Sequence, residues 1–170
     1  MIVFREVQQF RQWWIRLILA SMPAVFGWGL YQQFVRGVPW GSKPMTDGGL
    51  VIATAFALLL PLWLWNVRLI IEVTDTKLEF VMWLMWRRRR IPLEEIERAE
   101  AVSYRPLRDY GGWGIRRGFD GWCYNVSGNR GVRVELAGGE KLLLGSQKAE
   151  ELARAIAERK SLLGVRRSPV

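Results

Sequence analysis

The sequence contains no histidine and only one cysteine, Cys123. Without histidine the chain lacks the commonest general base and the usual zinc ligand, which argues against histidine-dependent hydrolases and zinc enzymes. A lone cysteine cannot form an intramolecular disulfide, so nothing indicates an oxidising compartment, and we expect Cys123 to be buried. The carboxylates are scattered, without a pair spaced for acid–base catalysis or metal binding. The sequence therefore predicts no catalytic residue, no metal, no cofactor and no enzymatic activity.

Charge is missing from two long apolar stretches, residues 17–35 and 48–67. About 20 apolar residues suffice to span a bilayer, so both stretches predict transmembrane helices, at residues 14–35 and 48–67. Tryptophans such as Trp13, Trp14 and Trp65 lie near the predicted ends, where aromatic rings favour the headgroup layer. A pair of buried core helices is the alternative, but the rest of the chain is too small to cover both.

Basic residues dominate on one side of this hairpin. The segments before the first helix and after the second carry Arg5, Arg11, Arg16, Arg68, Arg87, Arg88, Arg89 and Arg90. The connecting loop has only Arg36 and Lys43. The excess of positive charge on cytoplasmic loops therefore predicts a multi-pass protein of the inner (plasma) membrane with both termini in the cytoplasm.

After the second helix the pattern changes to short extended stretches separated by turns. Strands are predicted at residues 69–74, 77–82, 87–93, 96–104, 121–128, 130–136 and 141–146. Residues 146–160 predict a helix with Ser146 as its N-cap. This order predicts a membrane helical hairpin followed by an α+β domain, a bent antiparallel sheet of about seven strands with one C-terminal helix. The predicted boundaries are 1–68 for the hairpin segment, 69–161 for the domain and 162–170 for a basic tail.

Four motifs in this second part resemble those of a known family. They are IPLEEI at 91–96, YRPLRDYGGWGIR at 104–116, NVSGNRGVRVEL at 125–136 and GGEKLLLGSQKAEELARAI at 138–156. Together they resemble the bacterial pleckstrin-homology-like (PH-like) family of small membrane proteins. The resemblance implies N-terminal membrane helices, a bent sheet closed at one end by a helix, and no established enzymatic activity. The segment VMWLMW at 81–86 departs from the family, where we expect a turn containing glycine or proline.

The first candidate site is an apolar segment followed by four arginines. It comprises Trp83, Leu84, Met85, Trp86, Arg87, Arg88, Arg89 and Arg90. The first strand leads away from the bilayer, so its antiparallel partner returns this segment towards the membrane. There the apolar side chains would enter the interface, and each arginine near an anionic leaflet would contribute about 1 kcal/mol. Alternatively the aromatic residues pack on the sheet, on the helices or on a partner protein, and the arginines form a solvated strand face. Nucleic-acid binding is disfavoured because the run adjoins hydrophobic residues close to the membrane.

The second candidate site is the glycine-rich loop between residues 104 and 120. Its predicted ligand-binding residues are Arg105, Arg108, Gly111, Gly112, Gly114, Arg116 and Arg117. Glycines permit backbone conformations in which N–H groups converge on an anion, and guanidinium groups suit phosphate. A purely structural loop, with glycines serving tight turns, is the alternative. No nucleotide-binding motif accompanies the loop.

These features predict a membrane-anchored, non-enzymatic PH-like module at the cytoplasmic membrane face. Its expected partners are membrane lipids, anionic ones included, or a membrane protein, and self-association through a sheet edge or the helices is also expected. An alternative is an accessory or assembly subunit of a larger membrane transporter or envelope complex, in which small residues such as Gly27 and Gly29 allow close helix packing. A third is an enzyme acting on phospholipid through the glycine-rich loop, for which Arg116 would be needed.

Overall fold

The computed structural model describes residues 1–118 and 120–167 of the chain, which divides into two compact units. One unit is Arg11–Asn66 and is helical. The other, which is β-rich, combines Met1–Phe10 with the chain from Val67 onwards. The N-terminal residues, which the sequence analysis placed in the hairpin segment, therefore contribute to the β-rich unit.

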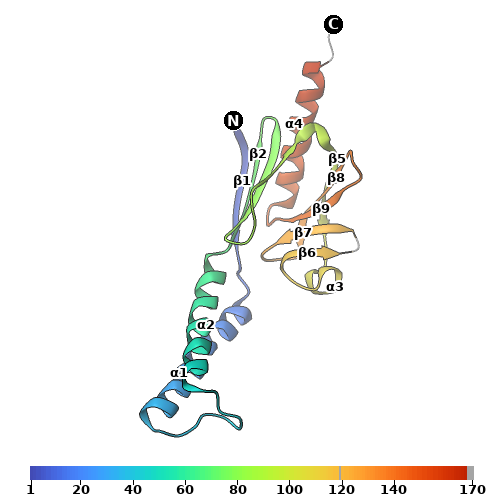
Figure 1. Ribbon diagram of the computed structural model, residues 1–170. Coiled ribbons are helices and arrows are strands. Elements are labelled where there is room, and N and C mark those ends of the chain that lie inside the picture. Colours follow the sequence, from blue (N-terminus) through green and yellow to red (C-terminus); the bar gives the residue numbers. More distant parts are fainter. Residues whose placement is uncertain (119, 168–170) are drawn as a thin grey trace. The chain divides into compact units, whose positions relative to one another are not determined.

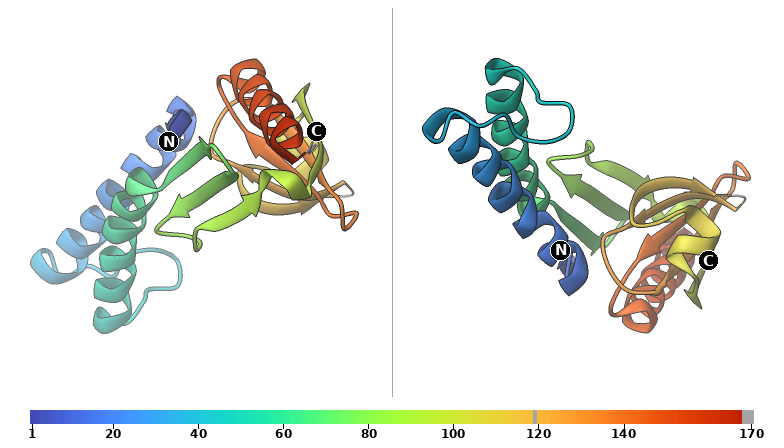
Figure 2. Two further views of the ribbon diagram at one scale, coloured as in Figure 1. Left: turned by 90° about the horizontal axis from the view of Figure 1, so that it is seen from above. Right: turned by 90° about the horizontal axis from the view of Figure 1, so that it is seen from below.

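The helical unit consists of two helices that run side by side (Figures 1 and 2). Helix α1 (Trp13–Leu30) continues into a π-helical turn, η1 (Tyr31–Val35), and α2 covers Asp47–Asn66. Both helices are long and apolar enough to cross a membrane. Pro23 and Pro61 lie inside them, as expected where neighbouring groups satisfy the freed backbone carbonyls.

Side-chain contacts at several points help to hold this hairpin together. The Arg16 guanidinium lies 5.7 Å from the centre of the Trp65 ring. Gly29 is packed so closely against Trp40 that a Cβ at that position would lie 2.6 Å from the indole ring. At the other end of the helices, the Gln33 side-chain amide donates a hydrogen bond of 2.6 Å to the Asp47 carboxylate.

Sheet A of the β-rich unit has four antiparallel strands in the order β1-β2-β3-β4. They are β1 (Ile2–Gln9), β2 (Arg68–Thr74), β3 (Lys77–Trp83) and β4 (Arg89–Pro92). Alternate residues of β2 and β3, such as Ile71 and Phe80, are buried, which is the period expected for strands with one covered face. The predicted β2–β3 hairpin is confirmed, whereas β1 was not anticipated.

Sheet B has five strands in the order β5-β8-β9-β7-β6, with β7 and β9 parallel. After the short helix η2 (Leu93–Glu95) come β5 (Ile96–Ser103), helix α3 (Pro106–Tyr110), β6 (Gly114–Gly118), β7 (Gly121–Asn125), β8 (Arg130–Leu136) and β9 (Lys141–Gly145). The α+β class is confirmed, but the single bent sheet of about seven strands is wrong. Strand β1, which pairs with β2, and the short strand β6 within the glycine-rich loop add to the predicted strands, and the chain passes from sheet A to sheet B through η2, between β4 and β5.

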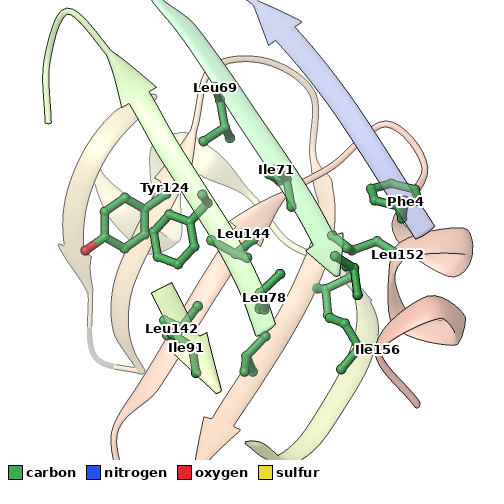
Figure 3. Close-up of a cluster of buried hydrophobic side chains, with 14 of the residues drawn as sticks. Phe4, Leu69, Ile71, Leu78, Ile91, Tyr124, Leu142, Leu144, Leu152 and Ile156 are labelled. Atoms are coloured by element: carbon green, nitrogen blue, oxygen red, sulfur yellow. The ribbon is translucent and has the colours of Figure 1, made fainter. Parts of the chain in front are cut away.

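The main core lies between the two sheets and is closed by helix α4 (Ala149–Arg167), the predicted C-terminal helix. Figure 3 shows Ile71 and Leu78 of sheet A with Leu142 and Leu144 of sheet B, and Leu152 of α4 beside them. All of these side chains are fully buried. Burial of this kind is the dominant favourable contribution to folding.

Strand β1 turns two polar side chains inward. The Glu6 carboxylate accepts hydrogen bonds from the Ser146 hydroxyl (2.5 Å) and the Gln147 backbone N–H (2.9 Å). The Gln8 amide donates to the Gly145 carbonyl (2.7 Å). The predicted N-cap Ser146 also accepts a bond from the Lys148 N–H, just before α4 begins. These bonds tie β1 to the corner between β9 and α4.

Candidate functional site

The apolar segment after β3 lies at the end of sheet A that leads into the helical unit. The strand register places Gln9, Arg68 and Trp83 opposite one another on three neighbouring strands. The helical unit begins at Arg11 and ends at Asn66, each only two residues from this row. Trp83 therefore lies opposite the two strand ends, Gln9 and Arg68, from which the chain continues into the helical unit.

This segment forms a tight turn with an unusual backbone. The Met85 and Trp86 N–H groups both donate to the Met82 carbonyl, at 3.0 and 2.8 Å. At its centre Leu84 has φ +68°, a left-handed conformation that costs an ordinary L-residue about 1–2 kcal/mol. Glycine or asparagine would avoid most of this cost, and burial offsets it only in part for a leucine, because 45% of the Leu84 surface is exposed.

Three of the four predicted apolar residues face the solvent. Trp83, Leu84 and Trp86 are 49%, 45% and 61% exposed, and we call them the apolar turn. Met85 instead packs against the main core, where it holds the turn in place. Exposed tryptophans are typical of residues that lie in the headgroup layer of a membrane.

Most of the arginines that follow the turn form ion pairs within the protein. On the outer face of sheet A, Arg5, Glu72, Glu79 and Arg90 lie in one cross-strand row. Arg88 bridges the two carboxylates at 3.0 and 3.1 Å, while Arg90 contacts Glu79 at 3.4 Å and Arg5 contacts Glu72 at 3.2 Å. We call this row, together with Arg88, the charge ladder. The hydrogen bonds from Arg88 to Glu79 and Glu72 raise the pKa of Arg88.

The Arg89 side chain lies instead against the connection between β8 and β9. Its guanidinium makes two bonds to the Glu140 carboxylate, at 2.8 and 2.5 Å, which raise the pKa of Arg89 and lower that of Glu140. Within the described residues, Arg87 alone of the run shows no ion pair. Nearby carboxylates bind Arg88, Arg89 and Arg90, so the charge that these three residues would offer to a membrane is largely balanced within the protein. The membrane-facing role of the four arginines stays a prediction.

The glycines of the second candidate site do not form an anion cradle. Gly111, Gly112 and Gly114 adopt the positive φ angles that only glycine tolerates well, +69°, +132° and +111°. Their N–H groups donate to protein acceptors, namely Leu107 O (3.1 Å), Pro106 O (2.9 Å) and Asn125 Oδ1 (2.9 Å). The predicted convergence of these N–H groups on a ligand is wrong, because all three already end α3 or hold the loop.

A buried polar network fixes the base of this loop. Asn125 is fully buried, accepts the Gly114 N–H and donates to the Tyr104 hydroxyl at 3.0 Å. Burial raises the pKa of Tyr104. A Cβ on Gly145 would lie 2.7 Å from the Asn125 Cβ, so the network abuts the residue that Gln8 binds. The base of the loop thus lies close to the end of β1 from which the helical unit begins.

Helix α3 covers a small second core on the outer face of sheet B. This core contains Tyr104, Tyr110, Cys123 and Leu143. Cys123 is fully buried, as predicted, and burial raises the pKa of its thiol to about 12. At neutral pH it is an uncharged thiol without the thiolate needed for nucleophilic chemistry.

Four exposed arginines surround α3 and β6, and we call them the basic patch. They are Arg105, Arg108, Arg116 and Arg117, and the described part of the chain shows no ion pair for any of them. The one carboxylate on α3, Asp109, accepts the Arg105 backbone N–H at 2.8 Å. A shallow hollow beside Arg117 is lined by Asp109, Tyr110, Gly111 and Gly118. The structure thus brings the four predicted arginines to one end of sheet B.

Leu107 is a residue of this surface that sequence reasoning missed. It lies on α3 between Arg105 and Arg108, and 65% of its surface is exposed. The signal was present as an apolar residue within RPLR, but only the formation of α3 turns that side chain outward.

Among the described residues, no group of three or more cysteine, aspartate or glutamate side chains is placed to hold a metal ion. No model of a known protein family matches the chain, and no curated protein sequence matches it. Its function must therefore be argued from the geometry of the apolar turn and the basic patch.

Proposed function

We propose that this protein is a membrane-anchored, non-enzymatic binding module of the PH-like type, whose β-rich unit rests on the cytoplasmic leaflet through the apolar turn. One observation carries the proposal. Trp83, Leu84 and Trp86 are exposed at the end of sheet A where the chain enters and leaves the two apolar helices. If the helices span the bilayer, this end lies at the membrane surface.

The pairing of β1 with β2 supports a hairpin that crosses the membrane and returns. The strand before α1 and the strand after α2 are hydrogen-bonded neighbours, with Gln9 opposite Arg68. Both ends of the helical unit must therefore lie on the same side of any membrane. The excess of arginines on that side favours the cytoplasm, because cytoplasmic loops carry more positive charge.

The strained backbone at Leu84 also supports a role in binding. Residues held in unfavourable conformations persist where the structure uses them, and they cluster at ligand contacts. At Leu84 the strain holds an aliphatic side chain in the solvent between two exposed tryptophans. Insertion of these side chains into the acyl boundary would recover the free energy that their exposure costs.

The PH-like assignment draws support from the general architecture. The family implies an α+β domain closed by a C-terminal helix, and α4 closes the core here, although that core lies between two sheets and not within one bent sheet. The non-enzymatic assignment draws support from the chemistry of the site. Its one thiol is protonated and buried, and its polar network is fully engaged in holding the loop.

Depth-dependent quenching in the full-length protein tests the proposal. The chain is reconstituted into phosphatidylcholine vesicles carrying a bilayer-restricted quencher lipid, with an environment-sensitive dye on Leu84→Cys. We expect strong quenching and a blue-shifted emission. The native Cys123 is buried and stays unlabelled in the folded protein.

The matched control places the dye on Ala137→Cys. Ala137 is exposed and donates its N–H to the backbone carbonyl of Glu95 in η2, which follows Pro92, the partner of Lys77 at the other end of β3 from Trp83. This dye should remain unquenched. Equal, weak quenching at both positions would reject the proposal. Protection of Leu84→Cys in native membranes but not in vesicles would favour the accessory-subunit alternative.

A further inference from the structure

The surface formed by α3 and β6 combines one exposed apolar side chain with unneutralised charge. Leu107 projects from α3, and Arg105 and Arg108 flank it. Arg116 and Arg117 extend to opposite faces of the neighbouring strand β6, which is an edge strand of sheet B. Apolar residues rimmed by arginine are the composition of interfacial membrane contacts.

This surface lies at the same end of the β-rich unit as the apolar turn. Figure 1 shows α3 and β6 at that end, with the C-terminal part of α4 at the opposite end. The contacts agree, because Gln8 binds the Gly145 carbonyl and Gly145 packs against Asn125, which holds Gly114 at the start of β6. One bilayer surface can therefore meet both sites.

The donors of the basic patch determine what it can recognise. A stereospecific phosphate site needs donors fixed in position, such as converging backbone N–H groups. Here the N–H groups of Gly111, Gly112 and Gly114 are already engaged. What remains is four exposed guanidinium groups without an ion pair among the described residues: Arg116 donates to the Trp113 carbonyl at 3.3 Å, and Arg117 lines the open hollow. Such groups respond to the density of negative charge more than to the shape of one headgroup.

We propose that the α3–β6 surface is a second membrane contact, in which Leu107 enters the headgroup layer and the four arginines bind acidic phospholipids by charge density. The inference rests on the proposed function, since it requires the β-rich unit to lie on a bilayer. It specifies the class of lipid that is bound: any acidic phospholipid binds, in proportion to its charge. The apolar turn provides attachment that does not depend on lipid charge, and the basic patch adds attachment that does.

The test uses the full-length protein in vesicles with the dye on Leu107→Cys and a bilayer-restricted quencher. Phosphatidylglycerol replaces phosphatidylcholine in steps. We expect quenching at Leu107→Cys to rise with phosphatidylglycerol content and to fall with added NaCl. Quenching at Leu84→Cys should change little over the same series.

Charge variants then identify the residues. Each arginine near an acidic surface contributes about a fivefold change in the ratio of docked to undocked unit, so Arg108→Gln should lower this ratio about fivefold and Arg108→Gln/Arg117→Gln roughly twenty- to thirtyfold. Arg154→Gln is the matched control, because Arg154 is an exposed arginine on α4 without an ion pair in the described chain. It should leave the ratio unchanged. An equal effect of Arg154→Gln would reject the assignment to this surface.

Two further comparisons distinguish binding by charge density from binding of one defined ligand. A multiply phosphorylated inositol lipid is compared with phosphatidylglycerol at equal total surface charge, and soluble pyrophosphate is compared with NaCl at equal ionic strength. Charge-density binding predicts equal responses in both comparisons. A response to one headgroup alone, or displacement by pyrophosphate beyond the salt effect, would overturn the inference.

Loss of quenching at Leu84→Cys in every lipid rejects the proposed function itself. Quenching at Leu84→Cys without a response at Leu107→Cys rejects only the second contact.

Discussion

Arg88, Arg89 and Arg90 behind the apolar turn differ from the arginines of the basic patch in what lies next to them. Behind the turn, carboxylates lie within 3.4 Å of each arginine, and Glu72 and Glu79 are adjacent on the same face of sheet A. Around α3 and β6, the nearest carboxylate on the helix binds a backbone N–H. A run of four arginines is thus largely neutralised, whereas the four arginines of the basic patch, which lie apart in the sequence, have no ion pair among the described residues.

This difference shows that local charge density in a sequence is a poor guide to charge on the surface. Two adjacent strand carboxylates repel each other unless cations lie between them, and Arg88 with its neighbours supplies these cations. The charge ladder therefore has a structural role. We expect substitutions in the ladder to change stability and substitutions in the basic patch to change binding.

The largest expected effect comes from removing the buried side chain of Asn125, whose hydrogen bonds hold the base of the glycine-rich loop. Asn125→Ala leaves the buried Gly114 N–H and Tyr104 hydroxyl without their partner, which should lower the free energy of unfolding by about 2–3 kcal/mol. Denaturant unfolding in detergent micelles measures it. The control Asn129→Ala alters an exposed side chain and should change stability by less than about 0.5 kcal/mol. If the two variants unfold alike, the network does not hold the loop.

A smaller loss is expected in the charge ladder. Glu79→Gln removes the carboxylate that binds Arg88 and Arg90, so the free energy of unfolding should fall by about 1–2 kcal/mol. Arg108→Gln, in the basic patch, should stay within about 0.5 kcal/mol of the parent, because no ion pair is lost. The same unfolding measurement compares both variants. Equal destabilisation would contradict the distinction between the two groups of arginines.

At the apolar turn, a substitution should raise stability while weakening membrane contact. Leu84→Gly relieves the left-handed backbone and should increase the free energy of unfolding by about 1 kcal/mol. It also deletes an exposed apolar side chain, so quenching of a dye placed on Trp86→Cys should decrease. Met85→Leu, which keeps a core-packed apolar side chain, is the control for the quenching. A destabilised Leu84→Gly protein would show that the turn is not strained.

The smallest expected effect is a dependence on pH. Arg89 lowers the pKa of Glu140 in the folded protein, so the folded state binds this proton less readily than the unfolded chain does. The ion pair therefore contributes stability above about pH 4.3, and the contribution is lost as pH falls through the lowered pKa. Both side chains are partly exposed, which limits the contribution to about 0.5 kcal/mol.

Unfolding titrations between neutral and acidic pH, compared with those of Arg89→Gln, isolate this contribution. The difference in stability between the two proteins should shrink towards acidic pH. A difference that stays constant across the titration would mean that the Arg89–Glu140 pair does not contribute through charge.

Much of the secondary structure could be predicted because it depends on neighbouring residues. The two apolar runs, the alternation along β2 and β3, and the periodic face of α4 are all readable from contiguous sequence. Strand β1 could not be recognised in this way. Its inward residues include Glu6 and Gln8, which break the alternation expected of a strand with an apolar inner face.

The sequence by itself determined the apolar helices, the hairpin of β2 and β3, the C-terminal helix, and the arginines and aromatic residues that a membrane contact requires. Only the tertiary structure decided which of these groups remain available. Arg88 meets Glu72 across 16 positions, Arg89 meets Glu140 across 51, and Glu6 reaches Ser146 across 140. Hydrogen bonds and ion pairs act over a few ångströms in space, so whether an arginine is free depends on partners that the fold brings from distant parts of the chain.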